Sequence, residues 1–349
     1  MSVEQSASFS LSRLERENPG LASYFIWDNN PMPMTDGSAW LHMGCGVRVF
    51  DGFVNLDICP QDLRVVKWNF LGMWPEQLAE KIEGVFSEDC FEHFFHGEQT
   101  YILCNINRAL RPGGVARILM PLLAMGNSDP GPGDYFHDAY GVETNTDALN
   151  YGMRFTGHRW LHNQNSLARM ASICGLEATP TNCSTSIEPK FNGLNLRDET
   201  NSASFAADLR KTRSISRRLV SSGNVTGATK IEDVANGSLY VATTARPTVE
   251  YSLQQSVPSE SVVCINFRSS NLSSFDWPLK TLVIDEVNRG KPWYFDETLK
   301  SQPCMNVITK SQLKVALGGH RNISTLHFSP ATNPGEFFTV GCAELYRTK

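Results

Sequence analysis

The chain has 349 residues, 41% of them hydrophobic and 19% charged, which is enough apolar material for a sizeable core and long enough to favour two domains. The net charge of −5 and the pI near 5.9 argue against a nucleic-acid-binding protein, which needs a basic surface to neutralise phosphates. No run of about 18 apolar residues predicts a membrane span. The nine cysteines form no C-x-x-C pair and the N-terminus lacks a signal-peptide layout, so we expect reduced thiols and a cytoplasmic protein.

The beginning of the chain predicts strands. Residues 1–38 form a polar N-terminal extension, and the apolar run 39–43 then predicts a buried strand that ends in a glycine-containing turn. Residues 53–58 predict a second strand, which closes near an acidic residue, and residues 64–69 predict a third.

Helices alternate with strands in the next part of the chain. Residues 75–81 predict a helix with proline in its first turn, and residues 84–87 predict a short strand. Helical apolar spacing covers 96–110, ends at an Arg-Pro-Gly-Gly sequence and is followed by a buried strand at 115–120. This alternation predicts an α/β fold of the Rossmann-like type with a parallel sheet.

The second half of this domain is less regular. Residues 122–157 are rich in Gly, Pro, Asp and Asn, which predicts an irregular lid. A helix is expected at 165–174. Residues 195–235 are expected to form a polar insertion, helical over 200–221, whose basic residues make a solvated helix face.

A change of pattern predicts a second domain. Residues 237–243 predict the strand that closes the first domain, which then spans 39–246. Beyond it, short β-rich runs separated by turns occur at 262–267, 281–284, 323–328 and 337–340. This pattern predicts a small antiparallel β-sandwich domain over 248–349, with the boundary near 246–250.

The turn after the first strand has the chemistry of a nucleoside pocket. Gly44 and Gly46 at the carboxyl end of a strand let the backbone approach a ligand, and Asp57 at the end of the next strand can accept hydrogen bonds from ribose hydroxyls. An NAD(P) fingerprint needs a Gly or Ala where Val49 stands and a larger gap than 11 residues to the acid. A tight turn that binds no ligand is the other interpretation.

Several consecutive segments resemble class I S-adenosylmethionine-dependent methyltransferases, in particular the group found in bacterial surface-polysaccharide biosynthesis. The segments that carry the resemblance are LHMGCG (41–46), GFVNLDI (52–58), FSEDCFEHFF (86–95), NRALRPGGVARILMP (107–121), GHRWLHNQNSLARMASICGLE (157–177) and GSLYVATT (237–244). Their order and spacing, more than any single one, make the combination specific.

The resemblance implies S-adenosylmethionine as cofactor and gives a role to individual residues. Gly44, Cys45 and Gly46 would line its methionine part and Asp57 would hold its ribose. The whole cofactor-binding set comprises His42, Gly44, Cys45, Gly46, Asp57, Asn69, Ser87 and Glu88.

Three positions depart from the family pattern. Asn69 stands where an acidic residue often lies near the adenine, and an amide can still bond its amino group. His42 replaces a polar or acidic residue. Leu122 stands where an acid is common, which puts substrate binding in doubt more than cofactor binding.

Methyl transfer to a hydroxyl needs positioning and a base that takes the proton. The candidates are His93, His137, Asp138, His158 and His162. Structural roles in loops, turns and helix caps are the alternatives for each. His93 and His96 have a spacing compatible with a metal, but no third ligand is suitably spaced, so no metal site is expected.

The C-terminal part also carries a resemblance. HRNISTLHFSPATNPGEFFTVGCAELYR (320–347) and KPWYFDETLKSQPCMNVIT (291–309) resemble small β-sandwich modules attached to bacterial polysaccharide glycosyltransferases. Together the resemblances imply methyl transfer to a sugar hydroxyl of a surface glycan or its precursor, at a polysaccharide assembly complex. Two alternatives stay open: an inactive methyltransferase fold that serves as a glycan-binding scaffold, and a methyltransferase for a small metabolite or a protein.

Overall fold

The computed structural model describes residues 39–94, 96–121, 144, 153, 157–196, 204–220, 224–234, 237–245, 247–258 and 333–349, together with the backbone of short strands between 262 and 328. The chain divides into two compact units, with the main division between Ser216 and Arg217. We call them the α/β unit, whose described residues lie within 39–70, 74–216 and 348–349, and the β unit, whose described residues lie within 71–73 and 217–347. Among the described residues, no helix has the length and apolar character needed to cross a membrane.

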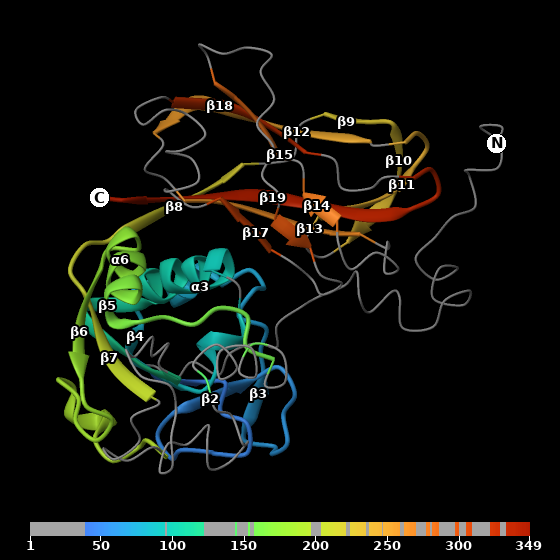
Figure 1. Cartoon of the computed structure of the whole chain (residues 1–349). Helices are drawn as coiled ribbons and strands as arrows, with labels where there is room; N and C mark the ends of the chain where they lie inside the picture. The colour runs from blue at the N-terminus through green and yellow to red at the C-terminus, as the bar shows by residue number, and fades with distance from the viewer. Residues whose placement is uncertain are drawn as a thin grey trace. The chain divides into compact units, whose positions relative to one another are not determined.

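A seven-stranded sheet organises the α/β unit (Figure 1). Its strands, in chain order, are β1 (Ala39–Met43), β2 (Val54–Asp57), β3 (Val65–Lys67), β4 (Ile82–Glu88), β5 (Leu110–Pro121), β6 (Leu176–Thr181) and β7 (Ser204–Lys211). In space they follow the order β3-β2-β1-β4-β5-β7-β6. The first five pair in parallel, and β7 runs antiparallel to both of its neighbours. The five strands predicted up to residue 120 are therefore confirmed, within a mixed rather than a purely parallel sheet.

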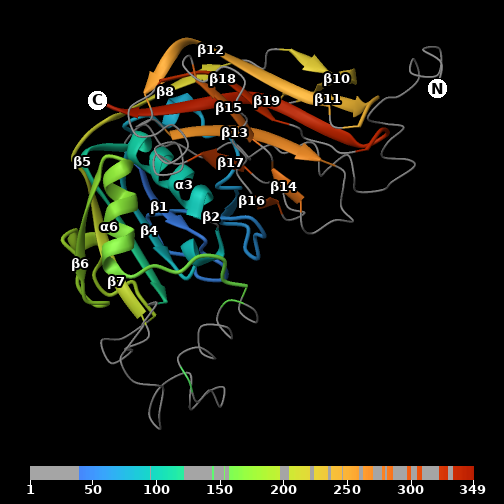
Figure 2. The ribbon, with the colours of Figure 1, turned by 45° about the horizontal axis from the view of Figure 1, so that its top comes forward.

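Two helices lie side by side against the sheet (Figures 1 and 2). They are α3 (His96–Ala109) and α6 (Gln164–Ile173), both expected from the sequence. The Asn163 side chain accepts a hydrogen bond from the backbone N–H of Ser166, and this cap fixes the start of α6. The buried thiols of Cys104 and Cys174 meet between the two helices, 3.5 Å apart.

An aromatic cluster fills the core next to β1 and β4. His42 and Phe86 are paired across these strands, and the His42 ring stacks on Phe50 at 4.2 Å. Phe191, in the short 3-10 helix η4 (Pro189–Phe191), closes the cluster against Phe86 at 6.0 Å. The connection from β6 to β7 therefore covers this part of the core.

Residues 75–81 do not form the expected helix. Only Glu76–Leu78 is helical, as the 3-10 turn η2, and the chain leaves it at Ala79 with an extended backbone. Glu80 then adopts a positive φ of 59°. A residue with a side chain rarely takes this conformation, and it is incompatible with a continuing helix.

The predicted helix over 200–221 is also wrong in the part of it that the structure describes. The segment forms β7 and β8 (Ile215–Val220), and β7 lies between β5 and β6 with most of its residues buried. The basic residues do not form a solvated helix face. Lys211 is buried and its Nζ donates 2.7 Å to the carbonyl of Leu110. The side chain of Arg217 is only 5% exposed and pairs with Glu344 at 3.2 Å.

The β unit consists of antiparallel sheets. Its further strands are β9 (Val225–Thr226), β10 (Ala228–Val234), β11 (Gly237–Ala242), β12 (Thr248–Pro258), β13 (Val262–Ser269), β14 (Trp277–Leu279), β15 (Thr281–Asp285), β16 (Glu297–Leu299), β17 (Met305–Ile308), β18 (Asn322–Phe328) and β19 (Phe337–Thr348). One sheet has the order β10-β11-β19-β13-β17 with β8 added at β19, and another has the order β15-β18-β12-β9. The four β-rich runs predicted beyond residue 250 are confirmed as strands.

A hydrogen bond joins the two large sheets of the β unit. The buried Tyr251 hydroxyl of β12 donates 2.7 Å to the carbonyl of Gly341 in β19.

The β unit begins earlier in the chain than expected. β11 pairs with β10 and β19, so residues 237–243 do not form the last strand of the first domain. The division at Ser216 thus precedes the expected boundary near 246–250.

Candidate active site

The order of the strands makes the carboxyl ends of β1, β2 and β4 a candidate ligand site. The chain runs from β1 outward through β2 and β3, and then returns to the other side of β1 as β4. Met43 pairs with Leu56 of β2 and with Ser87 of β4. Open α/β sheets bind ligands in the crevice that forms where the strand order reverses in this way.

The turn after β1 has two glycines with different constraints. Gly44 has a φ of +66°, and a Cβ there would lie 2.6 Å from the Cβ of Cys90. Gly46 has a φ of +52°, and a Cβ there would meet nothing within 4 Å. Gly44 is therefore required for packing against Cys90, whereas Gly46 faces open space into which a ligand can fit.

Asp57 is held beside this space by backbone donors. Its Oδ2 accepts from the N–H of Gly46 at 2.9 Å, and its Oδ1 accepts from the N–H of Cys59 at 2.8 Å. A carboxylate has about four acceptor sites, so both oxygens can still accept from the hydroxyls of a ligand. The two bonds fix the direction in which Asp57 presents them.

Residues 44–53, which connect β1 to β2, contain no helix. In a dinucleotide-binding fold, the glycine turn opens a helix whose N-terminus binds the pyrophosphate. The turn of this chain leads instead into turns and extended backbone. This arrangement suits a nucleoside ligand that carries no phosphates.

The other predicted cofactor residues differ in accessibility. Cys45 is 4% exposed, and burial together with Asp57 raises the pKa of its thiol to about 11, so it remains protonated. Asn69 is buried just beyond the end of β3, and Ser87 is fully buried at the end of β4. Of the predicted set, Gly46 and Asp57 have the geometry best suited to touch a ligand.

His42 does not line the site. Its ring is 2% exposed, lies between Phe50 and Phe86, and bonds to Oδ1 of Asn55 through Nδ1 at 3.1 Å. Burial lowers its pKa to about 4, so the ring is neutral at pH 7. Its position in β1, paired with Phe86 of β4, makes it part of the aromatic core.

Glu88 is held by an ion pair that the sequence did not reveal. Its Oε2 lies 2.8 Å from Nη1 of Arg48, and both of its oxygens accept from the N–H of Leu196 at 3.0 Å. Arg48 also donates to the carbonyl of Leu194. Glu88 therefore anchors the rim of the site, and Arg48 brings a partly exposed cation to it, two residues after Gly46.

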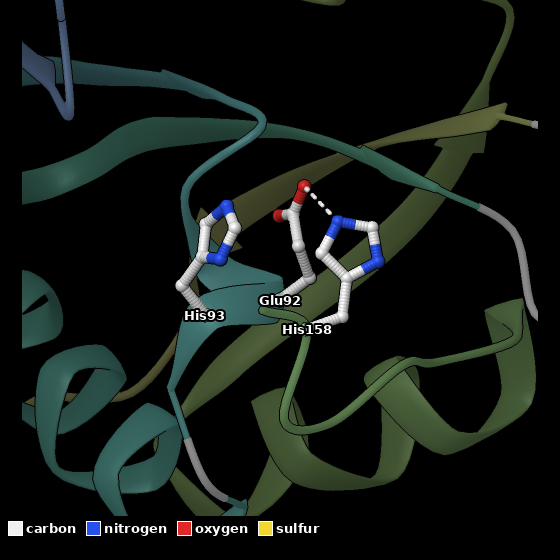
Figure 3. A group of neighbouring side chains, drawn as sticks. All are labelled: Glu92, His93 and His158. Carbon is white, nitrogen blue, oxygen red and sulfur yellow. Dashed lines mark ion pairs between the residues drawn. The ribbon is translucent and has the colours of Figure 1, made fainter. Parts of the chain in front are cut away.

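Glu92, His93 and His158 form a cluster beyond the end of β4 (Figure 3). Glu92 and His93 lie in the 3-10 helix η3 (Phe91–His93), which follows β4 almost directly. One donor atom from each of the three side chains lies within 4.8 Å of the other two. His158 Nε2 is 3.9 Å from Oε1 of Glu92, and the two imidazole rings meet edge to face at 5.2 Å. Two predicted bases thus come together with a carboxylate.

The loop that carries His158 is tied to η3 through the backbone. The carbonyl of Glu92 accepts from the N–H of Arg159 at 2.7 Å and from the N–H of Trp160 at 3.2 Å. His93 Nδ1 lies 3.3 Å from the carbonyl of Gly157. These contacts keep the two halves of the cluster in place independently of its side-chain carboxylate.

The remaining candidate bases are elsewhere. His162 is 1% exposed, with Nε2 bonded to Gln99 at 2.7 Å and Nδ1 bonded to Ser166 at 2.8 Å, and burial lowers its pKa to about 4. It is a buried core residue just before the start of α6. His137 and Asp138 lie outside the described residues.

Two residues of the site were not assigned a role from the sequence. Glu92 directly precedes His93 after the fourth strand, and this adjacency was the available signal. Arg48 had no distinguishing signal, because its partner Glu88 is 40 residues away.

Comparison with known proteins finds similarity only to solved structures. No family model matches the chain, and no curated protein matches it. Among solved structures it is similar to a SAM-dependent methyltransferase from Archaeoglobus fulgidus, with 13% identity over 60% of this chain and 97% of that chain and a TM-score of 0.32. It is also similar to an S-adenosylmethionine-dependent methyltransferase from Mesorhizobium loti, with 14% identity over 51% and 93% of the two chains and a TM-score of 0.31.

A third similar structure contains a product of methyl transfer. It is phosphoethanolamine N-methyltransferase 2 from Haemonchus contortus with S-adenosylhomocysteine, at 16% identity over 60% of this chain and 52% of that chain and a TM-score of 0.31. Because identities and TM-scores are this low, the geometry of the chain's own residues carries the functional interpretation.

Proposed function

We propose that the chain is a S-adenosylmethionine-dependent methyltransferase whose cofactor lies over the carboxyl ends of β1, β2 and β4. The observation that carries the proposal is the open space at Gly46 next to Asp57, at the reversal of the strand order. Asp57 would accept hydrogen bonds from the ribose hydroxyls, and the backbone at Gly46 would adjoin the methionine part of the cofactor.

The connection after β1 supports this cofactor over a dinucleotide. With no helix in residues 44–53, no helix N-terminus is available there to bind a pyrophosphate. S-adenosylmethionine has a ribose but no phosphate. Its methionine carboxylate is an anion, and the partly exposed Arg48 is a suitable cation at the rim.

The cluster of Glu92, His93 and His158 is suited to the chemical step. In the transfer, the acceptor oxygen bonds to the methyl carbon while the carbon–sulfur bond breaks, and its electron pair stays on sulfur as S-adenosylhomocysteine forms. The acceptor hydroxyl loses its proton. Glu92 and His93 follow β4 almost directly in the chain, at the carboxyl end of the strand, over which the proposed cofactor would lie. We assign the activation of the hydroxyl to it.

The proposed acceptor is a sugar hydroxyl of a surface glycan or of its precursor. The resemblance of the sequence motifs motivates this choice. Trp160 adds a structural reason, because its side chain is 43% exposed and its backbone is bonded to Glu92 of the cluster. Exposed aromatic rings present an apolar face on which a sugar ring can stack.

Calorimetric titration with S-adenosylmethionine and S-adenosylhomocysteine tests the cofactor. We expect micromolar binding by the wild type and by the control Asp51→Ala, whose side chain is fully exposed. Asp57→Ala and the more conservative Asp57→Asn should weaken binding at least ~10-fold, with folding checked by circular dichroism. Absence of binding at millimolar ligand, or equal binding by the Asp57 variants, would contradict the proposal.

Release of S-adenosylhomocysteine, measured with panels of acceptors, tests the substrate class. We expect turnover with nucleotide-linked or lipid-linked sugars and a mass increase of one methyl group on a sugar oxygen. Turnover with only small metabolites or proteins would retain the methyltransferase and reject the glycan acceptor.

A further inference from the structure

We propose that Glu92, His93 and His158 bind a divalent transition-metal ion. Their donor atoms lie within 4.8 Å of one another, and they supply two imidazole nitrogens and one carboxylate oxygen. Two histidines with one carboxylate form the ligand set of several catalytic zinc sites and of non-haem iron sites. In both, the ion keeps open positions for water or substrate.

The ligands are oriented as such a site requires. His93 Nδ1 faces the carbonyl of Gly157 at 3.3 Å, and the tautomer that donates this hydrogen bond has its lone pair on Nε2. Histidines that bind metals commonly donate their second ring nitrogen to a carbonyl or carboxylate, which holds the ring in place. The hydrogen bonds from Arg159 and Trp160 to the Glu92 carbonyl hold His158 close to its partners.

The three side chains differ in solvent exposure, so the proposed ion would have one buried side and one accessible side. Glu92 is 1% exposed, His158 is half-buried with a side chain 12% exposed, and His93 is exposed. Metal–ligand bonds of about 2.0–2.2 Å require the donor atoms to approach by roughly 1 Å, and the accessible His93 ring can rotate to allow it. The buried carboxylate gains a cation, and the exposed side leaves the ion open to an acceptor.

The proposed role of the ion, unlike its binding, rests on the methyltransferase function. A bound divalent ion lowers the pKa of water from 15.7 to about 7, and it would lower that of a coordinated sugar hydroxyl in the same way. The hydroxyl proton would then leave to solvent, and neither imidazole would need to be free to accept it.

Titration with Zn²⁺ and Co²⁺ tests the site. We expect both ions to bind the wild type with one equivalent per chain and to raise its Tm. Co²⁺ held by nitrogen and oxygen ligands gives weak visible bands without the near-ultraviolet thiolate band, which separates this site from the cysteines. Glu92→Gln, His93→Ala and His158→Ala should each weaken binding more than about 100-fold, beyond the loss typical of residues that only orient ligands.

His96→Ala is the matched control, because His96 packs against Trp160 at 4.9 Å and is outside the cluster. It should bind both ions like the wild type. No binding at millimolar Co²⁺, a thiolate band, or equal binding by the three variants would overturn the metal site.

The same titrations with Asp57→Ala separate the two proposals. This variant should lose S-adenosylhomocysteine and keep Co²⁺. A wild type that binds Co²⁺ at the cluster but no S-adenosylhomocysteine would retain the metal site and reject the methyltransferase. The reverse result would reject the metal alone.

Discussion

The backbone N–H of Gly46 and the Oδ2 of Asp57 are joined by a hydrogen bond of 2.9 Å that spans the ends of β1 and β2. The bond sets the carboxylate at the border of the open space beside Gly46, where a Cβ would meet no atom within 4 Å. We therefore expect a substitution at Gly46 to affect binding of the proposed cofactor more than the stability of the fold.

Gly46→Ala should weaken cofactor binding with little loss of stability. Its positive φ costs an alanine about 1 kcal/mol, and the new methyl group projects into the space assigned to the cofactor. Calorimetry should show at least a ~10-fold loss of S-adenosylhomocysteine affinity. Gly113→Ala is the control, since Gly113 has a φ of +75°, no neighbour within 4 Å and a place at the opposite end of the sheet. Equal affinity losses in both variants would refute the assignment.

Gly44→Ala, unlike Gly46→Ala, should act mainly by destabilising the fold. The added Cβ would lie 2.6 Å from the Cβ of Cys90, so overpacking of about 1–3 kcal/mol adds to the strain of the positive φ. Urea denaturation measures the loss. The added Cβ meets both the Sγ and the Cβ of Cys90, so Cys90→Gly, which removes both atoms, should reduce the cost of the alanine more than Cys90→Ala, which removes only the Sγ. Equal costs in the two backgrounds would show that the contact with Cys90 is unimportant.

Asp208→Ala should be among the most destabilising single substitutions in the α/β unit. Asp208 and Arg117 are fully buried and pair at 3.0 Å, and Arg117 also donates to the carbonyls of Asn182 and Cys183. Removal of Asp208 leaves a buried, uncompensated guanidinium, at a cost of about 3–5 kcal/mol. Denaturation in urea should show this loss, and the double variant Arg117→Met with Asp208→Leu should recover part of it. A loss below about 1 kcal/mol would contradict the burial.

Acid should destabilise the protein through His42. Burial lowers its pKa in the folded chain to about 4, while the unfolded chain protonates near 6.5. The unfolded state therefore binds more protons between these values, and stability falls as the pH is lowered from about 6.5 to about 4. The slope is up to roughly 1.4 kcal/mol per pH unit for one group. His42→Phe removes this group and should reduce the slope of the urea midpoint against pH, while His162, whose pKa is lowered in the same way, keeps part of the slope. An unchanged slope would contradict the assignment.

The sequence revealed the site unevenly, and the reasons lie in the range of the interactions. The strand, the glycine turn and Asp57 were predicted because they are local and consecutive. The segment Phe205–Arg210 was expected to be helical, since Ala, Leu and Arg favour helices. Its pairing with β5 and β6 overrides this preference, and the partner that stabilises Asp208 lies 91 residues earlier. The meeting of His158 with Glu92 likewise depends on the folded chain.

The carbonyl of Glu92 has a consequence for how this site can change over evolutionary time. It holds the loop of Arg159 and Trp160 through backbone hydrogen bonds alone, which every amino acid at these positions except proline can make. These two bonds therefore persist when the side chain of Glu92 or His158 is exchanged, and only the contact of His93 with the Gly157 carbonyl depends on a side chain. The position of the loop is thus largely separate from the chemical groups that it presents, which would allow their reactivity to change without a rebuilt fold.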